Sequence, residues 1–336
     1  RDEQFLDKNN DQRLFDPSSL NNINIKNAKI NNDTLELTFN DGVSSKFEIN
    51  KLTSELLDSE NLLNTVKQKF WDSSLKNNPT YQFKENFYDS KDMYNLLKSF
   101  YEYGFVIVKN VPIQNNYIVD FANSIGCIRP TNFGEFFNVR SVPNPNDLAY
   151  TSLALSPHTD NPYRKPVPCI QVLHCIENEV RGGSSTLVDG FKVATHLKKN
   201  NLEYFEILTK IKVKFKFTDK NVVLKNKGEL IELDEENNLK QVRFNTRLDY
   251  VPILIKSQLD HYYKARKKIS DLYNSKKFRI EFKLKPGDLL MMDNHRLLHG
   301  RTVYDSNEGK RFLQGCYLDY DSSEGKLRHL QRTFKN

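Results

Sequence analysis

The sequence predicts an α+β protein that is mainly β, with a β-sandwich or jelly-roll core and a small β-rich N-terminal domain. Three observations support this: a hairpin pattern within the first 50 residues, a polar stretch over 76–91, and a helix followed by scattered strands from about residue 92. The 336 residues suffice for one large domain or two smaller ones, and 38% of them are hydrophobic, as in globular proteins.

The N-terminal hairpin is predicted over residues 34–49, which read TLELTFNDGVSSKFEI. Apolar residues alternate with polar ones on either side of Asp41-Gly42, and glycine suits the turn because it tolerates a positive φ. The polar, loop-like stretch over 76–91 is expected to separate two domains. We therefore expect a small domain over 1–75, a linker over 76–91 and a catalytic domain over 92–336.

The second domain should start with a helix and a buried strand. Residues 93–104, MYNLLKSFYEYG, have apolar positions at helical spacing and end on Gly104, and the apolar run 105–111 follows. A short helix is expected over 117–126. Further core strands are expected over 169–176, 184–190, 288–294 and 311–320. The chain has no glycine-rich phosphate loop of the Walker or Rossmann type.

Charge and cysteine usage exclude several classes of partner. The net charge is +7, but the lysines are scattered and no nucleic-acid-binding motif is present, so we expect a solvated surface and no nucleic-acid partner. No apolar run approaches the roughly 18 residues of a membrane span, so we expect no membrane partner. The four cysteines form no Cys-x-x-Cys pair, which fits a reducing cytoplasm.

A metal site is indicated by His158-Thr159-Asp160. In an extended chain, side chains two residues apart point to the same side, so His158 and Asp160 could bind the same metal ion. His299, at a predicted strand end, is the best third ligand, and two histidines with one carboxylate form the facial triad of non-haem Fe(II) oxygenases. The alternatives are a strand-end histidine with a turn aspartate, or a helical zinc pair of His295 and His299.

Arg311 strengthens the metal interpretation. It lies twelve residues after His299 and opens the predicted strand RFLQGCY, so antiparallel pairing could place it beside the metal. A guanidinium there suits bidentate binding of a distal carboxylate such as that of 2-oxoglutarate. The alternative role for Arg311 is an ordinary surface salt bridge.

Four long, correctly spaced stretches carry a family resemblance: LAYTSLALSPHTDNPY, IQVLHCIENEVRGGSSTLVDGF, KLKPGDLLMMDNHRLLHGR and RFLQGCYLDYD. With them the chain resembles the γ-butyrobetaine hydroxylase and trimethyllysine hydroxylase branch of the Fe(II)/2-oxoglutarate dioxygenases, and more distantly taurine dioxygenase. The resemblance implies a double-stranded β-helix core and the use of Fe(II), 2-oxoglutarate and O2. It places the catalytic iron ligands at His158, Asp160 and His299, and the cosubstrate-binding residues at Arg311 and Ser185.

The resemblance also implies a substrate site. It places an aromatic cage for a trimethylammonium group at Phe133, Phe137, Tyr150 and Tyr317, and anion contacts at Asn245 and Arg247. Ring faces attract a quaternary ammonium, although core packing is the alternative for any single ring. The unassigned Asn161 and Tyr163 are expected near the substrate mouth.

The predicted activity is hydroxylation of a small trimethylammonium zwitterion, with γ-butyrobetaine, which would yield carnitine, as the leading substrate. The alternatives are 2-(trimethylammonio)ethylphosphonate or trimethyllysine as substrate and, in another class, a non-catalytic binder of quaternary amines. Relatives are often homodimers, so a homodimer is expected. Relatives also often hold a zinc ion near the N-terminus with three cysteines and a histidine. Here Gln4, Leu6 and Asn9 stand in the cysteine places, so we expect no zinc.

Overall fold

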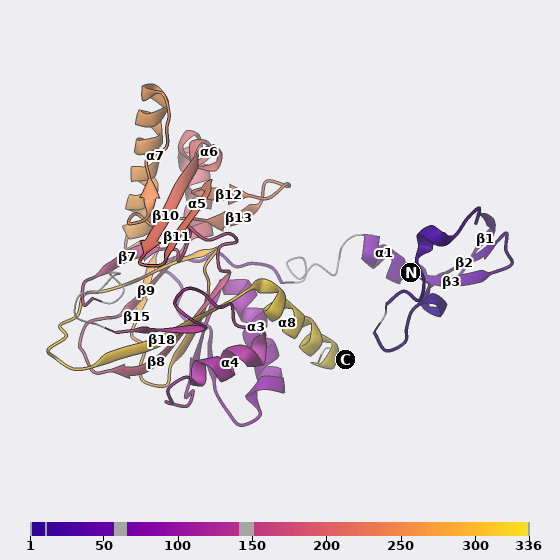
Figure 1. The fold of residues 1–336 in the computed structure, drawn as a ribbon, viewed down its shortest axis with the longest axis horizontal. Helices are drawn as coiled ribbons and strands as arrows, with labels where there is room; N and C mark the ends of the chain where they lie inside the picture. Colours follow the sequence, from indigo (N-terminus) through magenta and orange to yellow (C-terminus); the bar gives the residue numbers. More distant parts are fainter. Residues whose placement is uncertain (1, 11, 57–65, 141–150, 335–336) are drawn as a thin grey trace. The chain divides into compact units, whose positions relative to one another are not determined.

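The computed structural model describes residues 2–10, 12–56, 66–140 and 151–334, and it divides into two compact units, 1–65 and 66–336 (Figure 1). The boundary expected at residue 75 and the linker expected over 76–91 therefore both fall inside the second unit. The sequence does not show this boundary, because residues 66–75 are joined to the second unit by a few buried groups and not by a long apolar run.

Those groups surround Trp71, which is 5% exposed. Its ring packs edge-on against Phe105 at 5.3 Å, and its indole N–H donates to the carbonyl of Tyr103 at 2.7 Å. Asp189 and Arg296 form a buried ion pair. Asp189 accepts the Trp71 backbone N–H, and Arg296 donates to the Lys69 carbonyl. The preceding segment is thus tied into the second unit, and β4 (Thr80–Gln82) extends one of its sheets.

The first unit is the small β-rich fold that the sequence predicts. An antiparallel sheet of three strands is followed by a helix and preceded by two short 3-10 helices. The elements are η1 (Glu3–Phe5), η2 (Pro17–Ser19), β1 (Ile25–Asn31), β2 (Thr34–Phe39), β3 (Ser44–Glu48) and α1 (Ile49–Leu56). The predicted turn connects β2 to β3, with Gly42 at φ 88°, which favours glycine.

Polar contacts fasten the N-terminal segment of this unit to β3. The Gln4 amide donates to Asp2 Oδ2 at 2.6 Å, to the Ser44 carbonyl at 3.1 Å and to Ser45 Oγ at 3.3 Å. Phe5 packs edge-on against Phe15 at 5.3 Å. Gln4, at one of the places expected for a cysteine, therefore makes hydrogen bonds that hold the segment in position.

The second unit is built on two sheets that enclose a common apolar layer. Their strand orders are β4-β5-β16-β8-β18-β6 and β15-β9-β17-β7, and every pairing is antiparallel except β4 with β5. The further strands are β5 (Phe105–Lys109), β6 (Phe136–Val139), β7 (Leu155–His158), β8 (Ile170–Asn178), β9 (Ser185–Asp189), β15 (Arg279–Phe282), β16 (Leu289–Asp293), β17 (Leu297–Arg301) and β18 (Arg311–Leu318). One buried cluster joins residues of both sheets, including Leu187, Leu290 and Leu313. The predicted α+β, mainly β class with a jelly-roll core is confirmed.

Helices pack around these sheets in two groups (Figure 1). In the first group, α3 (Lys91–Tyr103), which ends at Gly104 as predicted, and α4 (Tyr117–Ile125) pack on the six-stranded sheet. The helix α8 (Tyr320–Phe334) packs against α3 and α4, and η3 (Phe87–Asp89) lies beside α3. The second group consists of α5 (Gly190–Asn200), α6 (Leu202–Lys210) and α7 (Lys256–Asn274). These helices share another apolar cluster with two smaller sheets. The strands of those sheets are β10 (Lys212–Asp219), β11 (Val222–Glu229) and β14 (Asp249–Tyr250), and β12 (Ile231–Leu233) and β13 (Leu239–Val242). Among the described helices, none has the length and apolar character that a bilayer crossing requires.

Candidate active site

Two neighbouring strands bring the predicted histidines together. In the four-stranded sheet, β7 pairs with β17 so that His158 stands opposite His299. The two imidazole centroids are 4.4 Å apart. The antiparallel register, rather than sequence proximity, therefore places two ligands from distant segments side by side.

Asp160 follows His158 by two residues, and its backbone is held from both sides. Asn294 Oδ1 accepts the Asp160 N–H at 2.7 Å, and the Asn294 amide donates to the Asp160 carbonyl at 3.0 Å. The intervening Thr159 N–H donates to the Phe244 carbonyl at 2.8 Å. The loop that leaves β7 is thus fixed by hydrogen bonds, which set the direction of the carboxylate.

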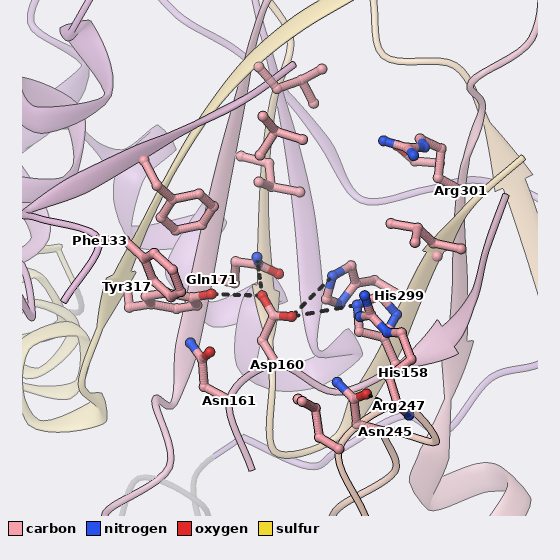
Figure 2. Close-up of a pocket in the computed structure, with 18 of the residues that line it drawn as sticks. Phe133, His158, Asp160, Asn161, Gln171, Asn245, Arg247, His299, Arg301 and Tyr317 are labelled. Atoms are coloured by element: carbon pink, nitrogen blue, oxygen red, sulfur yellow. Dashed lines mark hydrogen bonds and ion pairs between the residues drawn. The ribbon is translucent and has the colours of Figure 1, made fainter. Parts of the chain in front are cut away.

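The three side chains converge (Figure 2). Asp160 Oδ1 lies 3.5 Å from His158 Nε2 and 3.8 Å from His299 Nε2. One ligand atom from each residue lies within 4.8 Å of the others, and in the described part of the chain this is the one group of histidine, cysteine and acidic residues that could hold a metal ion.

The protonation states of this cluster fit a divalent metal. His158 Nδ1 lies 2.9 Å from the Ser156 carbonyl, which favours a proton on Nδ1 and leaves Nε2 as the ligand atom. Burial, with the neighbouring His158, lowers the pKa of His299 to about 3, so this imidazole is neutral. Burial opposes ionisation of Asp160, but the two imidazoles and the hydrogen bonds from His158 and Tyr317 lower its pKa overall. Two imidazole nitrogens and one carboxylate form a donor set that suits Fe(II).

The alternative zinc pair of His295 and His299 is wrong. Residues 289–301 form β16, a turn and β17, not a helix, and His295 lies in the turn that leads from one sheet to the other. The His295 ring hydrogen-bonds the Val167 carbonyl at 3.1 Å.

A cavity surrounds the three candidate metal ligands. Its lining comprises Phe133, Phe137, Val139, Leu155, His158, Asp160, Asn161, Tyr163, Gln171, Leu173, Ser185, Asn245, Arg247, Leu248, His299, Gly300, Arg301, Arg311, Leu313 and Tyr317. Every predicted site residue is in this set except Tyr150, which lies outside the described residues. Segments separated by up to 184 positions in the chain therefore meet in one place.

Arg311 is the first residue of β18 and is only 8% exposed. Its guanidinium donates to the Gly183 carbonyl at 3.3 Å, and its Nε has no hydrogen-bond partner among the described residues. The Tyr304 ring lies between two guanidinium groups, 5.4 Å from that of Arg311 and 5.1 Å from that of Arg301. A surface salt bridge does not describe this residue, because its side chain is buried and is one of those that line the cavity.

Aromatic rings form one wall of the cavity, on the far side of Asp160 from the imidazoles (Figure 2). The Phe137 and Tyr317 rings lie 5.3 Å apart at 31°, and Phe133 approaches Phe137 at 6.5 Å. Phe137 pairs with Gly315 across β6 and β18, where a Cβ would stand 2.5 Å from the Phe137 ring. Glycine at 315 therefore leaves the space that this ring occupies.

Two residues of the cavity, Gln171 and Arg301, carry no signal in the sequence. Gln171 Nε2 and Tyr317 Oη both donate to Asp160 Oδ2, at 2.6 and 2.7 Å. The Arg301 guanidinium donates to the carbonyls of Thr151 and Leu153, both at 2.7 Å. A period-two pattern places Gln171 on one face of a strand, but only the pairing of β8 with β18 brings it opposite Tyr317.

His299 lies in the middle of β17, not at the predicted strand end, and faces His158 at the end of β7. A jelly-roll fold that brings two histidines and one carboxylate together in this way defines the class of the non-haem Fe(II) oxygenases. The family follows from the sequence itself. Residues 73–317 match the family described as "Taurine catabolism dioxygenase TauD, TfdA family". The chain belongs to this family, and its predicted resemblance is confirmed.

Relatives in this family are similar along most of the chain. The chain is 31% identical to the human gamma-butyrobetaine dioxygenase over 345 residues, which cover 99% of this chain and 88% of the relative. It is 30% identical to the mitochondrial trimethyllysine dioxygenase of Mus musculus over 321 residues, which cover 92% and 75%. These values, with the family match, establish that the chain is a dioxygenase.

Solved structures share the fold at low identity. Asparagine oxygenase in complex with Fe(II), a hydroxyasparagine and succinate aligns with a TM-score of 0.55 at 13% identity, covering 70% of this chain and 80% of that one. The non-heme iron oxygenase OrfP with Fe, succinate and a hydroxyarginine gives 0.54 at 13%, covering 72% and 95%. The family and the donor set together support the predicted Fe(II), 2-oxoglutarate and O2 and a 2-oxoglutarate-dependent dioxygenase.

Proposed function

We propose that this dioxygenase hydroxylates γ-butyrobetaine to carnitine. The observation that carries the proposal is that aromatic rings and the predicted metal ligands line one cavity. Tyr317, whose ring belongs to the aromatic wall, donates a hydrogen bond to the predicted ligand Asp160. The names of the two groups of relatives, which act on γ-butyrobetaine and trimethyllysine, agree with a small trimethylammonium substrate.

His158, Asp160 and His299 would hold Fe(II) in this proposal, and they are the catalytic residues. When bound, the metal supplies with 2-oxoglutarate the chemistry that puts one oxygen atom of O2 into a C–H bond and the other into succinate, with release of CO2. The protein's own contribution is placement. Arg311 would bind the distal carboxylate of 2-oxoglutarate, and Ser185, 8% exposed on β9 of the other sheet, would add a hydroxyl near it.

The aromatic wall suits a cation that offers no hydrogen bond. Ring faces attract a quaternary ammonium, and the rings of Phe133, Phe137 and Tyr317 supply them. The Arg164 guanidinium already lies 5.9 Å from the Phe133 ring centroid. We therefore assign the principal contact to Phe137 and Tyr317, whose rings no cation of the described residues approaches in this way.

The charge of the remaining lining favours γ-butyrobetaine over trimethyllysine. Asp160 is the one carboxylate among the described lining residues, and it is committed to the metal. Trimethyllysine carries an additional α-ammonium, for which this lining provides no second carboxylate. Arg247 and the buried Asn245, whose amide also donates to the Thr159 carbonyl at 3.2 Å, stand where the single carboxylate of γ-butyrobetaine would be met.

Measurement of succinate separates the candidate functions. The purified full chain is incubated with Fe(II), 2-oxoglutarate and, in turn, γ-butyrobetaine, trimethyllysine and 2-(trimethylammonio)ethylphosphonate. We expect the highest kcat/KM for γ-butyrobetaine, with carnitine identified by mass spectrometry. A higher kcat/KM for another member of the panel would reassign the substrate. Binding of the amines without any succinate would favour the non-catalytic binder.

We also propose that the first unit folds without zinc. Residues 1–65 contain neither cysteine nor histidine, and Gln4 is engaged in hydrogen bonds to Asp2 and to β3. Elemental analysis of the purified protein should find no stoichiometric zinc attributable to residues 1–60. Zinc at one equivalent that persists when the His158 cluster is disrupted would refute this proposal.

A homodimer is proposed as the working assembly. The strand β14 lies at the edge of its sheet. The segment that follows it exposes Val251, Ile253 and Ile255, which alternate with less exposed residues. An exposed apolar segment beside a sheet edge is suited to a self-complementary interface between two copies. Light scattering should give twice the chain mass, and Ile253→Asp should shift it toward the monomer. A wild-type monomer at assay concentration contradicts the proposal.

A reducing, cytoplasmic location is proposed because all four cysteines are free. Burial raises the pKa of the Cys175 and Cys316 thiols to about 12, so both stay protonated and unreactive. Cell fractionation with an antibody against the chain tests the location, and recovery from an oxidising compartment would contradict it.

A further inference from the structure

The two oxygens of Asp160 have different surroundings. Oδ1 faces the two imidazoles, at 3.5 and 3.8 Å. Oδ2 points the other way and accepts two hydrogen bonds, from the Gln171 amide at 2.6 Å and from the Tyr317 hydroxyl at 2.7 Å (Figure 2). The carboxylate is therefore divided into one oxygen turned toward the imidazoles and one oxygen occupied by protein donors.

The two donors are held by the sheet rather than by flexible loops. Gln171 on β8 and Tyr317 on β18 are register partners, and both side chains are nearly fully buried. Since opposite residues on adjacent strands lie on the same face, they reach the same oxygen from a common side. Rotation of the carboxylate would break both bonds at once inside a buried site.

Tyr317 has a second role because its ring belongs to the aromatic wall. The ring lies against Phe137 at 5.3 Å, while its hydroxyl is bound to Asp160. One side chain thus touches both the expected cation pocket and the expected metal ligand.

We propose that Gln171 and Tyr317 are positioning residues that confine Asp160 to one-oxygen ligation of the metal, and that Tyr317 joins this function to the cation pocket. The inference rests on the proposed iron site. A carboxylate freed from these donors can rotate and offer both oxygens, which consumes a coordination position that the cosubstrate needs. Hydrogen-bond partners of metal ligands generally set the affinity for the metal.

Anaerobic calorimetric titration of the full chain with Mn(II) tests the proposal without turnover. Tyr317→Phe keeps the ring and removes the hydroxyl, and Gln171→Leu removes the other donor. Each should weaken Mn(II) binding by about 10- to 100-fold. In the Mn(II) form, each should also weaken 2-oxoglutarate binding. Tyr101→Phe, which removes a buried hydroxyl bonded to Ser323 away from the cavity, is the matched control and should bind Mn(II) like the wild type.

A crossed comparison separates the two roles of Tyr317. Phe137→Leu removes a ring of the wall without touching Asp160, so it should raise the KM for γ-butyrobetaine and leave Mn(II) affinity unchanged. Tyr317→Phe should show the opposite pattern, and circular dichroism should report a native fold for both. Wild-type Mn(II) and 2-oxoglutarate affinities in Tyr317→Phe and Gln171→Leu would overturn the proposal. Retained Mn(II) binding in His158→Ala would instead overturn the iron site itself.

Discussion

The polar end and the aromatic wall of the cavity are held in place by different forces. At the polar end, the Ser156 carbonyl, Asn294, Gln171 and Tyr317 fix individual atoms of His158 and Asp160 through hydrogen bonds. At the wall, ring contacts of 5.3 to 6.5 Å and the space left at Gly315 fix only the position of a surface. Hydrogen bonds are directional and packing is not, so changes at the polar end should reduce function more than changes at the wall, and loss of a metal ligand should reduce it most.

The largest effect is expected from His158→Ala, which removes a ligand outright. Mn(II) binding and succinate formation should both fall to background, because the remaining two ligands leave the metal without a complete facial set. Calorimetry and a succinate assay measure the two losses. Turnover that survives this substitution would remove the basis for the comparison between the two ends.

Arg311→Lys tests the cosubstrate end and should have the next largest effect. Lysine keeps the charge but loses the forked geometry, so the KM for 2-oxoglutarate should rise by about 10- to 100-fold. The KM for γ-butyrobetaine should change little. Lys310→Ala, at the exposed neighbouring position, is the control and should leave the KM for 2-oxoglutarate unchanged. An unchanged KM in Arg311→Lys would assign the carboxylate to another residue.

Phe137→Leu tests the wall and should have a graded effect. Loss of one ring face should raise the KM for γ-butyrobetaine by about 2- to 30-fold, since a cation–π contact contributes about 0.5–2 kcal/mol. Phe312→Leu, on the same strand as Gly315 but outside the cavity lining, provides the comparison. Equal effects of the two substitutions would indicate a packing defect rather than a lost cation contact.

His174→Leu lies outside the active site and should leave turnover at pH 7 unchanged. His174 is fully buried on β8, and neither ring nitrogen has a partner in the described structure. Burial lowers its pKa from 6.5 to about 4, so the unfolded chain binds its proton first as the pH falls. Above pH 6.5, His174 is neutral in both the folded and the unfolded chain and does not reduce stability. As the pH falls from 6.5 toward 4, protonation of the unfolded chain lowers the free energy of unfolding by roughly 3 kcal/mol.

Urea unfolding at several pH values between 7 and 4 measures this effect. The free energy of unfolding of the wild type should fall with pH more steeply than that of His174→Leu. His329→Leu, at an exposed position on α8, should keep the wild-type slope. Parallel slopes for wild type and His174→Leu would show that this buried imidazole does not titrate on unfolding.

The parts of the site that sequence reasoning can locate are those with local spacing or chemistry. His158 and Asp160 are two residues apart, and Arg311 is a charged residue at the start of an apolar strand. Gln171 could not be found in this way, because an amide within a strand has no preferred role until the strand pairing is known. The structure divides the chain at 65/66 rather than at the expected residue 75 for a related reason: the buried Trp71 and the distant Asp189–Arg296 ion pair join residues 66–75 to the second unit.

By itself, the sequence determined the class of fold, the small hairpin unit and the membership of the dioxygenase family, and it predicted His158, Asp160 and His299 as the metal ligands. These depend on alternation, turn residues and ordered motifs, which are properties of short segments. Only the tertiary structure decided that His158 faces His299, that Gly315 makes room for Phe137, and that Gln171 and Tyr317 meet on one oxygen of Asp160. Those relations depend on strand register, and register is set by the packing of the whole sheet.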